Sequence, residues 1–414
     1  MIYKAPRGTH DIFGVNAAKM SLLEQVARVI FRKRGFEEIR TPIFEDAALF
    51  MRSIGQVTDI VEKEMYVFED KKGRKLALRP EATASLARAF IENRLGISMP
   101  AGKFFYIGEM FRYERPQAGR YRQFHQIGGE FFGVSSPAAD AEIILLAQDL
   151  LYSVEVNEIS AHINSLGCKN CRPALREALV KYLDSGHGLC GDCLRRLKRN
   201  PLRVLDCKID SHKFTEIPQM SDYLCSECKC SFDLLQSLLE SAGCNYIVDN
   251  RLVRGLDYYT KTVFEIRQDT AGSREALAAG GRYDNLVEDI GGQSTPAVGF
   301  ALGSERVLAA AQKAKFFISF QESEKIYIAL ADSELFSEAF SFAVKIVKNG
   351  LRGNKNISVF GPLEDKNLTN QLKFADKIKA CTAVIFAKTE FEKGKVLVKN
   401  MKDKTQTEIS INEL

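Results

Sequence analysis

The stretch that decides the fold runs from Arg112 to Gly133 and reads RYERPQAGRYRQFHQIGGEFFG. It places four arginines, one histidine, three glutamines and two glutamates between runs of aromatic and aliphatic residues. The segments 103–113 and 120–134 predict two strands, which are joined by a turn at Pro116–Gly119. A solvated sheet face is the ordinary explanation for a polar strand pair of this kind.

Side chains alternate between the two faces of a strand, so residues of one parity lie together when no bulge intervenes. One face of this strand pair would gather Arg112 and Glu114 from the first strand, and Arg120, Arg122, Phe124, Gln126 and Glu130 from the second. The surrounding Phe and Tyr residues imply burial, and arginine is suited to two-point contact with phosphate or carboxylate oxygens. These residues favour a nucleotide site, although the sequence contains neither G-x-x-x-x-G-K-[ST] nor G-x-G-x-x-G.

The remaining composition sets broad limits. A chain of 414 residues, 45% hydrophobic and 27% charged, predicts a globular protein of two or three domains. Its net charge of +5 is compatible with nucleic-acid binding and decides nothing alone. No run of about 18 apolar residues occurs, so we expect no membrane span, no secretion and a cytoplasmic location.

Periodicity along the rest of the chain predicts a mixture of helices and strands. Helices are expected at 17–34, at 79–95 with Pro80 near the first turn, and at 138–154. The segment 36–46 alternates and contains Pro42, which predicts an edge or kinked strand. From Lys325 onward strands and helices alternate afresh, and this predicts a small α/β domain.

Several segments together resemble one family. FRYERPQAGRYRQFHQ is similar to motif 2 of class II aminoacyl-tRNA synthetases, in the form found in histidyl-tRNA synthetases. RTPIFED resembles motif 1 and GFALGSERVL resembles motif 3, while RGLDYYTKTVFE and AAGGRYDNLV resemble two segments peculiar to the histidine enzymes. The last segment has two glycines where many relatives have three. The resemblance runs from about Pro6 to the C-terminus.

This resemblance implies an α/β (α+β) fold with a class II antiparallel-sheet catalytic domain over residues 1–323. A cysteine-rich helical insertion at 168–243 would interrupt that domain, and residues 324–414 would form an α/β anticodon-binding domain. Motif 1 implies a homodimer. The implied activity is the reaction of L-histidine with ATP and Mg²⁺ to give histidyl-adenylate, followed by transfer of the histidyl group to tRNA(His).

The resemblance also implies roles for individual residues. Arg254 and Arg112 would be catalytic; for Arg254 a structural salt bridge is the alternative. ATP would be bound by Arg112, Glu114, Arg120, Phe124 and Arg306. Histidine would be bound by Glu81, Ala82, Thr83, Arg112, Gln126, Glu130, Arg254, Tyr258 and Tyr259, with Glu130 and Tyr259 contacting the imidazole. The tRNA acceptor end would meet Gln117 and Arg115, where a flexible surface turn is the alternative.

Nine of the ten cysteines lie between residues 168 and 244. Cys168-x2-Cys171, followed after 18 residues by Cys190-x2-Cys193, has the spacing of a four-thiolate zinc site. Half of this set could be completed or replaced by other cysteines, namely Cys207, Cys225, Cys228 and Cys230. The alternative to a zinc site is a group of buried free thiols. The basic run RRLKRNPLR (195–203) is either a solvated helix face or a contact with the tRNA backbone.

A non-catalytic protein is the competing interpretation. The regulatory subunit of ATP phosphoribosyltransferase resembles the synthetase catalytic domain, but it generally lacks the anticodon-binding domain and departs from the substrate-binding motifs. This chain keeps the motif residues, among them Arg112, Glu130, Arg254 and Tyr259, and continues into a final α/β segment. The sequence therefore favours the enzyme.

Overall fold

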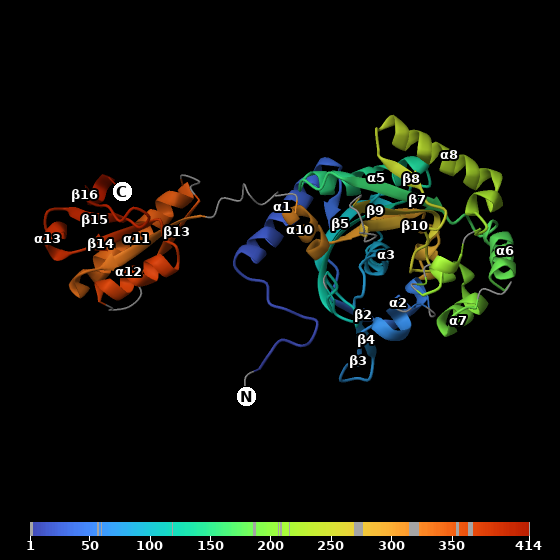
Figure 1. The fold of residues 1–414 in the computed structure, drawn as a ribbon, viewed down its shortest axis with the longest axis horizontal. Helices are drawn as coiled ribbons and strands as arrows, with labels where there is room; N and C mark the ends of the chain where they lie inside the picture. Colours follow the sequence, from blue (N-terminus) through green and yellow to red (C-terminus); the bar gives the residue numbers. More distant parts are fainter. Residues whose placement is uncertain are drawn as a thin grey trace. The chain divides into compact units, whose positions relative to one another are not determined.

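The computed structural model describes residues 3–413 except 56–57, 59, 118, 185–187, 206, 208, 215, 269–275, 314–322, 353–355 and 363–366. The chain divides into two compact units, Met1–Ile318 and Ser319–Leu414, each of which is described by itself (Figure 1). None of the helices in the described part of the chain combines the length and the apolar character that a membrane span requires.

The first unit is built on an eight-stranded sheet with the order β1-β5-β6-β11-β10-β9-β7-β8. Neighbouring strands are antiparallel except at the two edges, where β1 pairs in parallel with β5 and β8 with β7. The predicted fold class, with its mainly antiparallel sheet, is confirmed. The strands are β1 (Glu37–Glu38), β5 (Lys103–Phe111), β6 (Gln123–Phe132), β7 (Ile159–Ser165), β8 (Tyr246–Val248), β9 (Thr260–Gln268), β10 (Ala276–Arg282) and β11 (Ala297–Gly303).

One face of this sheet is covered by α1 (Val15–Lys33), α5 (Pro137–Tyr152), α8 (Ser226–Ser241) and α10 (Ser304–Lys313), whose apolar residues share one core with the strands. In α1 the buried Leu23, Ala27 and Phe31 recur at helical spacing, so one stripe of the helix faces the sheet. Phe31 stacks on Phe105 of β5 with 4.6 Å between ring centroids. Figure 1 shows α5 running along this face.

The opposite face is only partly covered, and this leaves room for a site. It carries α3 (Thr83–Glu92), where Phe90 stacks on Phe132 of β6 at 4.6 Å. Beside α3 lie α2 (Ala47–Ile54), η1 (Ile60–Glu64), α4 (Leu95–Ser98) and α9 (Leu286–Asp289), and a small sheet of β2 (Phe44–Asp46), β4 (Lys75–Leu78) and β3 (Val67–Glu69).

Between β7 and β8 the chain is helical. It forms α6 (Arg172–Asp184), α7 (Gly191–Arg199) and α8, and the short 3₁₀ turns η2 (Pro201–Val204), η3 (Ser211–Lys213) and η4 (Met220–Tyr223). Two side chains join this segment to the loop that precedes β9. Asn200 donates a hydrogen bond to the Asp257 carboxylate at 2.9 Å, and Arg203 donates one to the Gly255 carbonyl at 2.8 Å.

The second unit is a five-stranded sheet with the order β13-β12-β14-β15-β16. Parallel pairing joins β13, β12 and β14, whereas β15 and β16 are added antiparallel. Separate apolar clusters form around α11 and α12. The elements are β12 (Glu324–Leu330), η6 (Ser333–Leu335), α11 (Phe336–Arg352), β13 (Ile357–Phe360), α12 (Leu368–Lys377), β14 (Thr382–Phe386), α13 (Lys388–Phe391), β15 (Lys395–Asn400), β16 (Gln406–Ser410) and η7 (Ile411–Glu413).

Two predicted elements differ from the observed ones. The strand expected at 36–46 is divided into β1 and β2, with Pro42, which lacks an N–H donor, between them. The helix expected at 79–95 begins at Thr83, after Pro80 rather than around it. The reason is local, because the Glu81 carboxylate accepts hydrogen bonds from the N–H groups of Thr83 and Ala84 and thereby caps the helix.

Candidate active site

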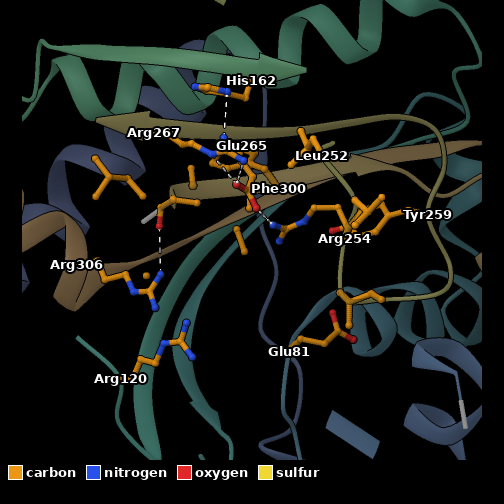
Figure 2. A pocket seen from close by; sticks show the side chains of 18 of the residues that line it. Glu81, Arg120, His162, Leu252, Arg254, Tyr259, Glu265, Arg267, Phe300 and Arg306 are labelled. Atoms are coloured by element: carbon orange, nitrogen blue, oxygen red, sulfur yellow. Dashed lines mark hydrogen bonds and ion pairs between the residues drawn. The ribbon is translucent and has the colours of Figure 1, made fainter. Parts of the chain in front are cut away.

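A cavity of about 1280 Å³ lies on the partly covered face of the large sheet. Its walls come from the strands β5, β6, β7, β9, β10 and β11, from the first turns of α3 and α10, from the loop between β8 and β9, and from the helical segment between β7 and β8. Figure 2 shows Arg120 and Arg306 on one side of the cavity, with Glu81 and Tyr259 on the other side and Arg254 between them. The cavity therefore has a cationic end and an end with carboxylate and phenol groups.

The cationic end contains Arg120 and Arg306, and Arg112 lines the cavity closer to Glu81, because its Nε donates a hydrogen bond to the Pro80 carbonyl at 2.8 Å. The Glu114 carboxylate lies 3.9 Å from Arg112 and 3.4 Å from Arg120, so it offsets part of their charge. The Arg112 guanidinium lies 5.3 Å from the centroid of the Phe124 ring. Three guanidinium groups around one space form a site suited to the oxygens of a polyphosphate.

The other end begins at the first turn of α3. Both Glu81 oxygens accept backbone hydrogen bonds from this turn, from Thr83 at 2.7 Å and Ala84 at 3.0 Å. Burial raises the pKa of Glu81, and the hydrogen bonds oppose that shift. Because Glu81 and Thr83 line the cavity, they present a carboxylate and a hydroxyl to whatever enters it.

Glu130 lies one layer deeper and is 1% exposed. It accepts a hydrogen bond from the Thr83 hydroxyl at 2.7 Å and another from the Tyr283 hydroxyl. Burial raises the pKa of Glu130 to about 8, although both hydrogen bonds favour the charged form. Thr83 and Tyr283 line the cavity, so Glu130 is coupled to it through the two side chains that hold it.

Gln126, Tyr258 and Tyr259 complete this end of the cavity. Both tyrosines are 6% exposed, and their ring centroids are 4.7 Å apart. The Gln126 Oε1 atom is buried and has no hydrogen-bond partner among the described residues. An unpaired buried acceptor is costly, so this atom is suited to a ligand that brings an N–H donor.

Arg254 extends from the loop before β9 and forms an ion pair with Glu265 on that strand. Glu265 also pairs with Arg267 at 2.8 Å, so one carboxylate serves two cations (Figure 2). Arg254 lines the cavity as well. The salt bridge considered from the sequence is therefore present, and it places the guanidinium at the cavity wall.

The register of β5 and β6 confirms most of the face expected from alternation. Met110 is opposite Phe124 and Gly108 is opposite Gln126, so these side chains share a face. Arg122 was expected on that face and does not lie there; it packs 3.7 Å from the centroid of the Tyr113 ring, outside the cavity. Strict alternation ends with the regular strands, β5 at Phe111 and β6 at Gln123, so it does not fix the side chain of Arg122.

Besides Glu130, which lies beneath the cavity wall, three residues expected at the site do not line this cavity. Ala82 is fully buried beneath the start of α3. Arg115 and Gln117 are exposed beside the turn between β5 and β6, where Gln117 pairs with Arg120 across the tip. The middle of this turn, Ala118, lies outside the described residues.

Other site residues had no role in the sequence analysis. Tyr283 and Glu265 stood within quoted segments, but only the structure reveals their partners, Glu130 and Arg254. Gly299 on β11 lies directly against the Glu130 carboxylate. Its position opposite Glu130 in the ladder could be found only once β6 and β11 were known to pair.

The cysteines are arranged differently from the single site suggested by their spacing. The pair Cys168 and Cys171 lies with Cys225 and Cys228, whereas Cys190 and Cys193 lie with Cys207 and Asp210. The grouping of Cys168, Cys171, Cys190 and Cys193 into one metal site is therefore corrected. Equal Cys-x2-Cys spacing identifies half-sites, but the tertiary fold decides which halves meet.

The basic run at 195–203 is also divided by the fold. Arg203 is 9% exposed and bonded to the Gly255 carbonyl, so it supports the loop before β9. Arg195 pairs with Asp192 at the surface, and Arg199 lies 3.5 Å from Glu62. A part of this run is therefore internal support rather than a solvated face.

The antiparallel sheet, with arginines at one end of the cavity on β5–β6 and α10, is the catalytic domain of a class II aminoacyl-tRNA synthetase. The crystal structure of apo S. aureus histidyl-tRNA synthetase matches it with a TM-score of 0.80 and 33% identity, covering 99% of this chain and 98% of that chain. A family model described as Histidyl-tRNA synthetase matches residues 8–180 and 212–307. The chain belongs to the histidyl-tRNA synthetase family.

Two further comparisons bear on the competing interpretation. The Histidine--tRNA ligase of Endomicrobium trichonymphae is 75% identical over 100% of both chains. An ATP phosphoribosyltransferase regulatory subunit/histidyl-tRNA synthetase from Bacillus halodurans shares 19% identity with a TM-score of 0.66, covering 90% of this chain and 96% of that one. The second likeness shows a common fold alone, so the regulatory-subunit alternative is not favoured.

Proposed function

We propose that this chain is a histidine–tRNA ligase, which joins L-histidine and ATP into histidyl-adenylate and transfers the histidyl group to the 3′ end of tRNA(His). The observation that carries this proposal is one cavity with Arg120 and Arg306 at one end, Glu81, Gln126 and Tyr259 at the other, and Arg112 in its lining beside Glu81. The first end suits a triphosphate, and the second suits an amino acid.

The activation step needs positioning and charge neutralisation more than a strong base. The histidine carboxylate oxygen attacks the α-phosphorus of ATP, and the bond from that phosphorus to the bridging oxygen of pyrophosphate breaks. Because the attacking group is already an anion, no proton has to be removed from it. Arg112 and Arg254 neutralise charge at the α-phosphate, while Arg120 and Arg306 hold the leaving phosphates.

Histidine would form hydrogen bonds with the polar groups at the other end of the cavity. The unpaired Gln126 Oε1 and the Glu81 carboxylate accept hydrogen bonds from the α-ammonium group. Tyr259 would contact one ring nitrogen, and Glu130 would act on the other from beneath the cavity wall, through the Thr83 and Tyr283 side chains that hold it. Buried partners of this kind discriminate strongly, because an analogue that lacks a matching group leaves them unpaired.

Mg²⁺ would accompany the ATP phosphates. Glu114 is a carboxylate donor beside the phosphate arginines, and hard oxygen ligands of this type suit Mg²⁺. The bound ion would add positive charge at the triphosphate, while the residues of the chain orient it and exclude water.

The rest of the chain would serve the tRNA and the assembly. Arg115 and Gln117 are exposed at the tip of the β5–β6 hairpin, where they would meet the acceptor end of tRNA(His). The unit from 324 onward would bind the anticodon, with the preceding residues 1–323 as catalytic domain and 168–243 as its insertion. We further infer a homodimer that uses the motif 1 segment and functions in the cytoplasm.

Histidine-dependent exchange of pyrophosphate into ATP tests the proposal directly. We expect exchange with histidine and none with glutamine or phenylalanine, and aminoacylation of tRNA(His) in a second assay. Glu130→Ala should raise the KM for histidine far more than the KM for ATP. A protein that is folded, yet catalyses no exchange with histidine, would overturn the function, and equal effects on both KM values would overturn the role of Glu130.

A further inference from the structure

The cysteine-rich segment between β7 and β8 forms two separate clusters of metal-binding side chains. The first cluster, named the inner tetrad, is Cys168, Cys171, Cys225 and Cys228; the second, named the outer tetrad, is Cys190, Cys193, Cys207 and Asp210. The ligand atoms of each tetrad all lie within 4.8 Å of one another. We propose that each tetrad binds one structural zinc ion.

The distances between sulfur atoms agree with a tetrahedral site. A zinc–sulfur bond of about 2.3 Å places the corners of a tetrahedron ~3.8 Å apart. In the inner tetrad the Cys168 sulfur lies 3.7 Å from that of Cys171 and 4.0 Å from that of Cys225. In the outer tetrad the sulfurs of Cys190 and Cys207 are 3.9 Å apart. A disulfide needs only about 2.05 Å, so these thiols are spaced for a shared metal.

Backbone N–H groups and helix N-termini lie beside several of the sulfur atoms. Cys190 is the N-cap of α7 and Cys225 is the N-cap of α8, where the helix dipole stabilises negative charge. The sulfur of Cys168 accepts a hydrogen bond from the N–H of Asn170 at 3.4 Å, and that of Cys171 accepts one from Cys225 at 3.2 Å. Such donors orient metal ligands and lower the cost of their charge.

Asp210 provides a further reason to expect a cation in the outer tetrad. Its side chain is 0% exposed and lies among three thiols. One oxygen accepts from Lys213 at 2.8 Å, and the other accepts from the N–H of Cys190 at 2.8 Å. Asp210 therefore places a buried carboxylate oxygen among three sulfur atoms, and carboxylate oxygen together with cysteine sulfur is a ligand set that zinc accepts.

The tetrads also connect the segment to the cavity. Arg172 follows Cys171 directly and donates a hydrogen bond to the Tyr259 carbonyl. Arg203 lies four residues before Cys207 and donates one to the Gly255 carbonyl. Zinc would therefore fix the two arginines that support the loop carrying Arg254 and Tyr259. These are positioning contacts, since neither arginine is assigned a contact with substrate.

Metal analysis of the full-length protein tests the proposal without reference to activity. We expect two zinc ions per chain by elemental analysis, and seven thiols that react with a thiol reagent only after chelation. Cys225→Ser should remove the inner ion and Cys207→Ser the outer ion, while the control variants Cys230→Ser and Cys381→Ser, at exposed cysteines outside both tetrads, should retain two. No zinc, one zinc per chain, or equal zinc content in all four variants would overturn the proposal.

A second variant separates ligation from simple misfolding. Asp210→Cys keeps four ligands, so it should still bind two metal ions. In the cobalt-substituted protein it should increase the thiolate-to-cobalt absorption, because one oxygen ligand is exchanged for sulfur. An unchanged cobalt spectrum would contradict ligation by Asp210.

The link to the cavity rests on the proposed function, and it has its own readout. Removing zinc should raise the KM for histidine roughly tenfold and leave the KM for ATP nearly unchanged. Re-addition of zinc should restore the original value. If the protein binds two zinc ions and their removal leaves the KM for histidine unchanged, only the positioning role is overturned. If the zinc-loaded protein catalyses no pyrophosphate exchange with histidine, the proposed function is overturned instead.

Discussion

Substitution of Gly299 by alanine should selectively weaken histidine binding. Gly299 lies on β11 opposite Glu130 of β6. A Cβ atom at this position would lie 2.5 Å from the Glu130 carboxyl carbon and 2.8 Å from the Gly129 carbonyl oxygen, and it would overlap a Glu130 oxygen outright. Ordinary contact needs at least about 3.4 Å, so the carboxyl group would have to move by about 1 Å or more.

Glu130 cannot move that far and keep its partners. Its oxygens are held by the Thr83 hydroxyl at 2.7 Å and by the Tyr283 hydroxyl. Leaving one of these buried hydroxyl donors without its partner costs about 1–3 kcal/mol, which corresponds to a roughly 5- to 150-fold rise in the KM for histidine. The KM for ATP should change little, because Arg120 and Arg306 lie on the other side of the cavity (Figure 2).

The assay is pyrophosphate exchange with histidine and ATP varied in turn. Gly303→Ala is the matched control, since it lies on the same strand and its added Cβ would approach nothing closer than 3.9 Å. That control should resemble the wild type in its KM for histidine. If Gly299→Ala binds histidine as well as Gly303→Ala does, then Glu130 is not held in the manner described, and the reasoning fails.

Three other predictions concern stability and support of the site. Burial raises the pKa of Glu130 to about 8. Between about pH 4.5 and 8 the folded chain therefore binds more protons than the unfolded chain. The free energy of unfolding falls as the pH rises through this range. Glu130→Gln should remove a slope of up to about 1.4 kcal/mol per pH unit, measured by thermal unfolding at pH 6 and pH 8; parallel pH profiles would argue against it. Arg282 is 1% exposed and forms an ion pair with the equally buried Asp140. Arg282→Met should lower the free energy of unfolding of the first unit by about 3–5 kcal/mol, because it leaves the Asp140 charge buried without a partner. An unchanged unfolding temperature would contradict this prediction. Arg203→Ala should raise the KM for histidine roughly tenfold through the loop at Gly255, whereas the exposed Arg199→Ala should not; the same KM in both would refute the support role.

Much of the fold could be predicted because its signals are local. The apolar residues at 22, 23, 26, 29 and 30 predict the helix at 17–34, which is observed as α1. Alternation along 120–134 places Phe124 and Gln126 on one face, and the β5–β6 register confirms it. The errors are also local: Arg122 stands just outside the paired strand, and the Glu81 cap delays α3 to Thr83.

What the sequence determined by itself was therefore the set of elements, the polar face of the hairpin and the family to which its motifs belong. Only the tertiary structure decided the partners of the site residues: Glu265 for Arg254, Tyr283 and Gly299 for Glu130, and the division of the cysteines into two tetrads. The physical reason is the range of the interactions. Periodicity and capping act within a few residues, whereas Cys168 and Cys225 are 57 residues apart, and only packing of the whole unit brings them together.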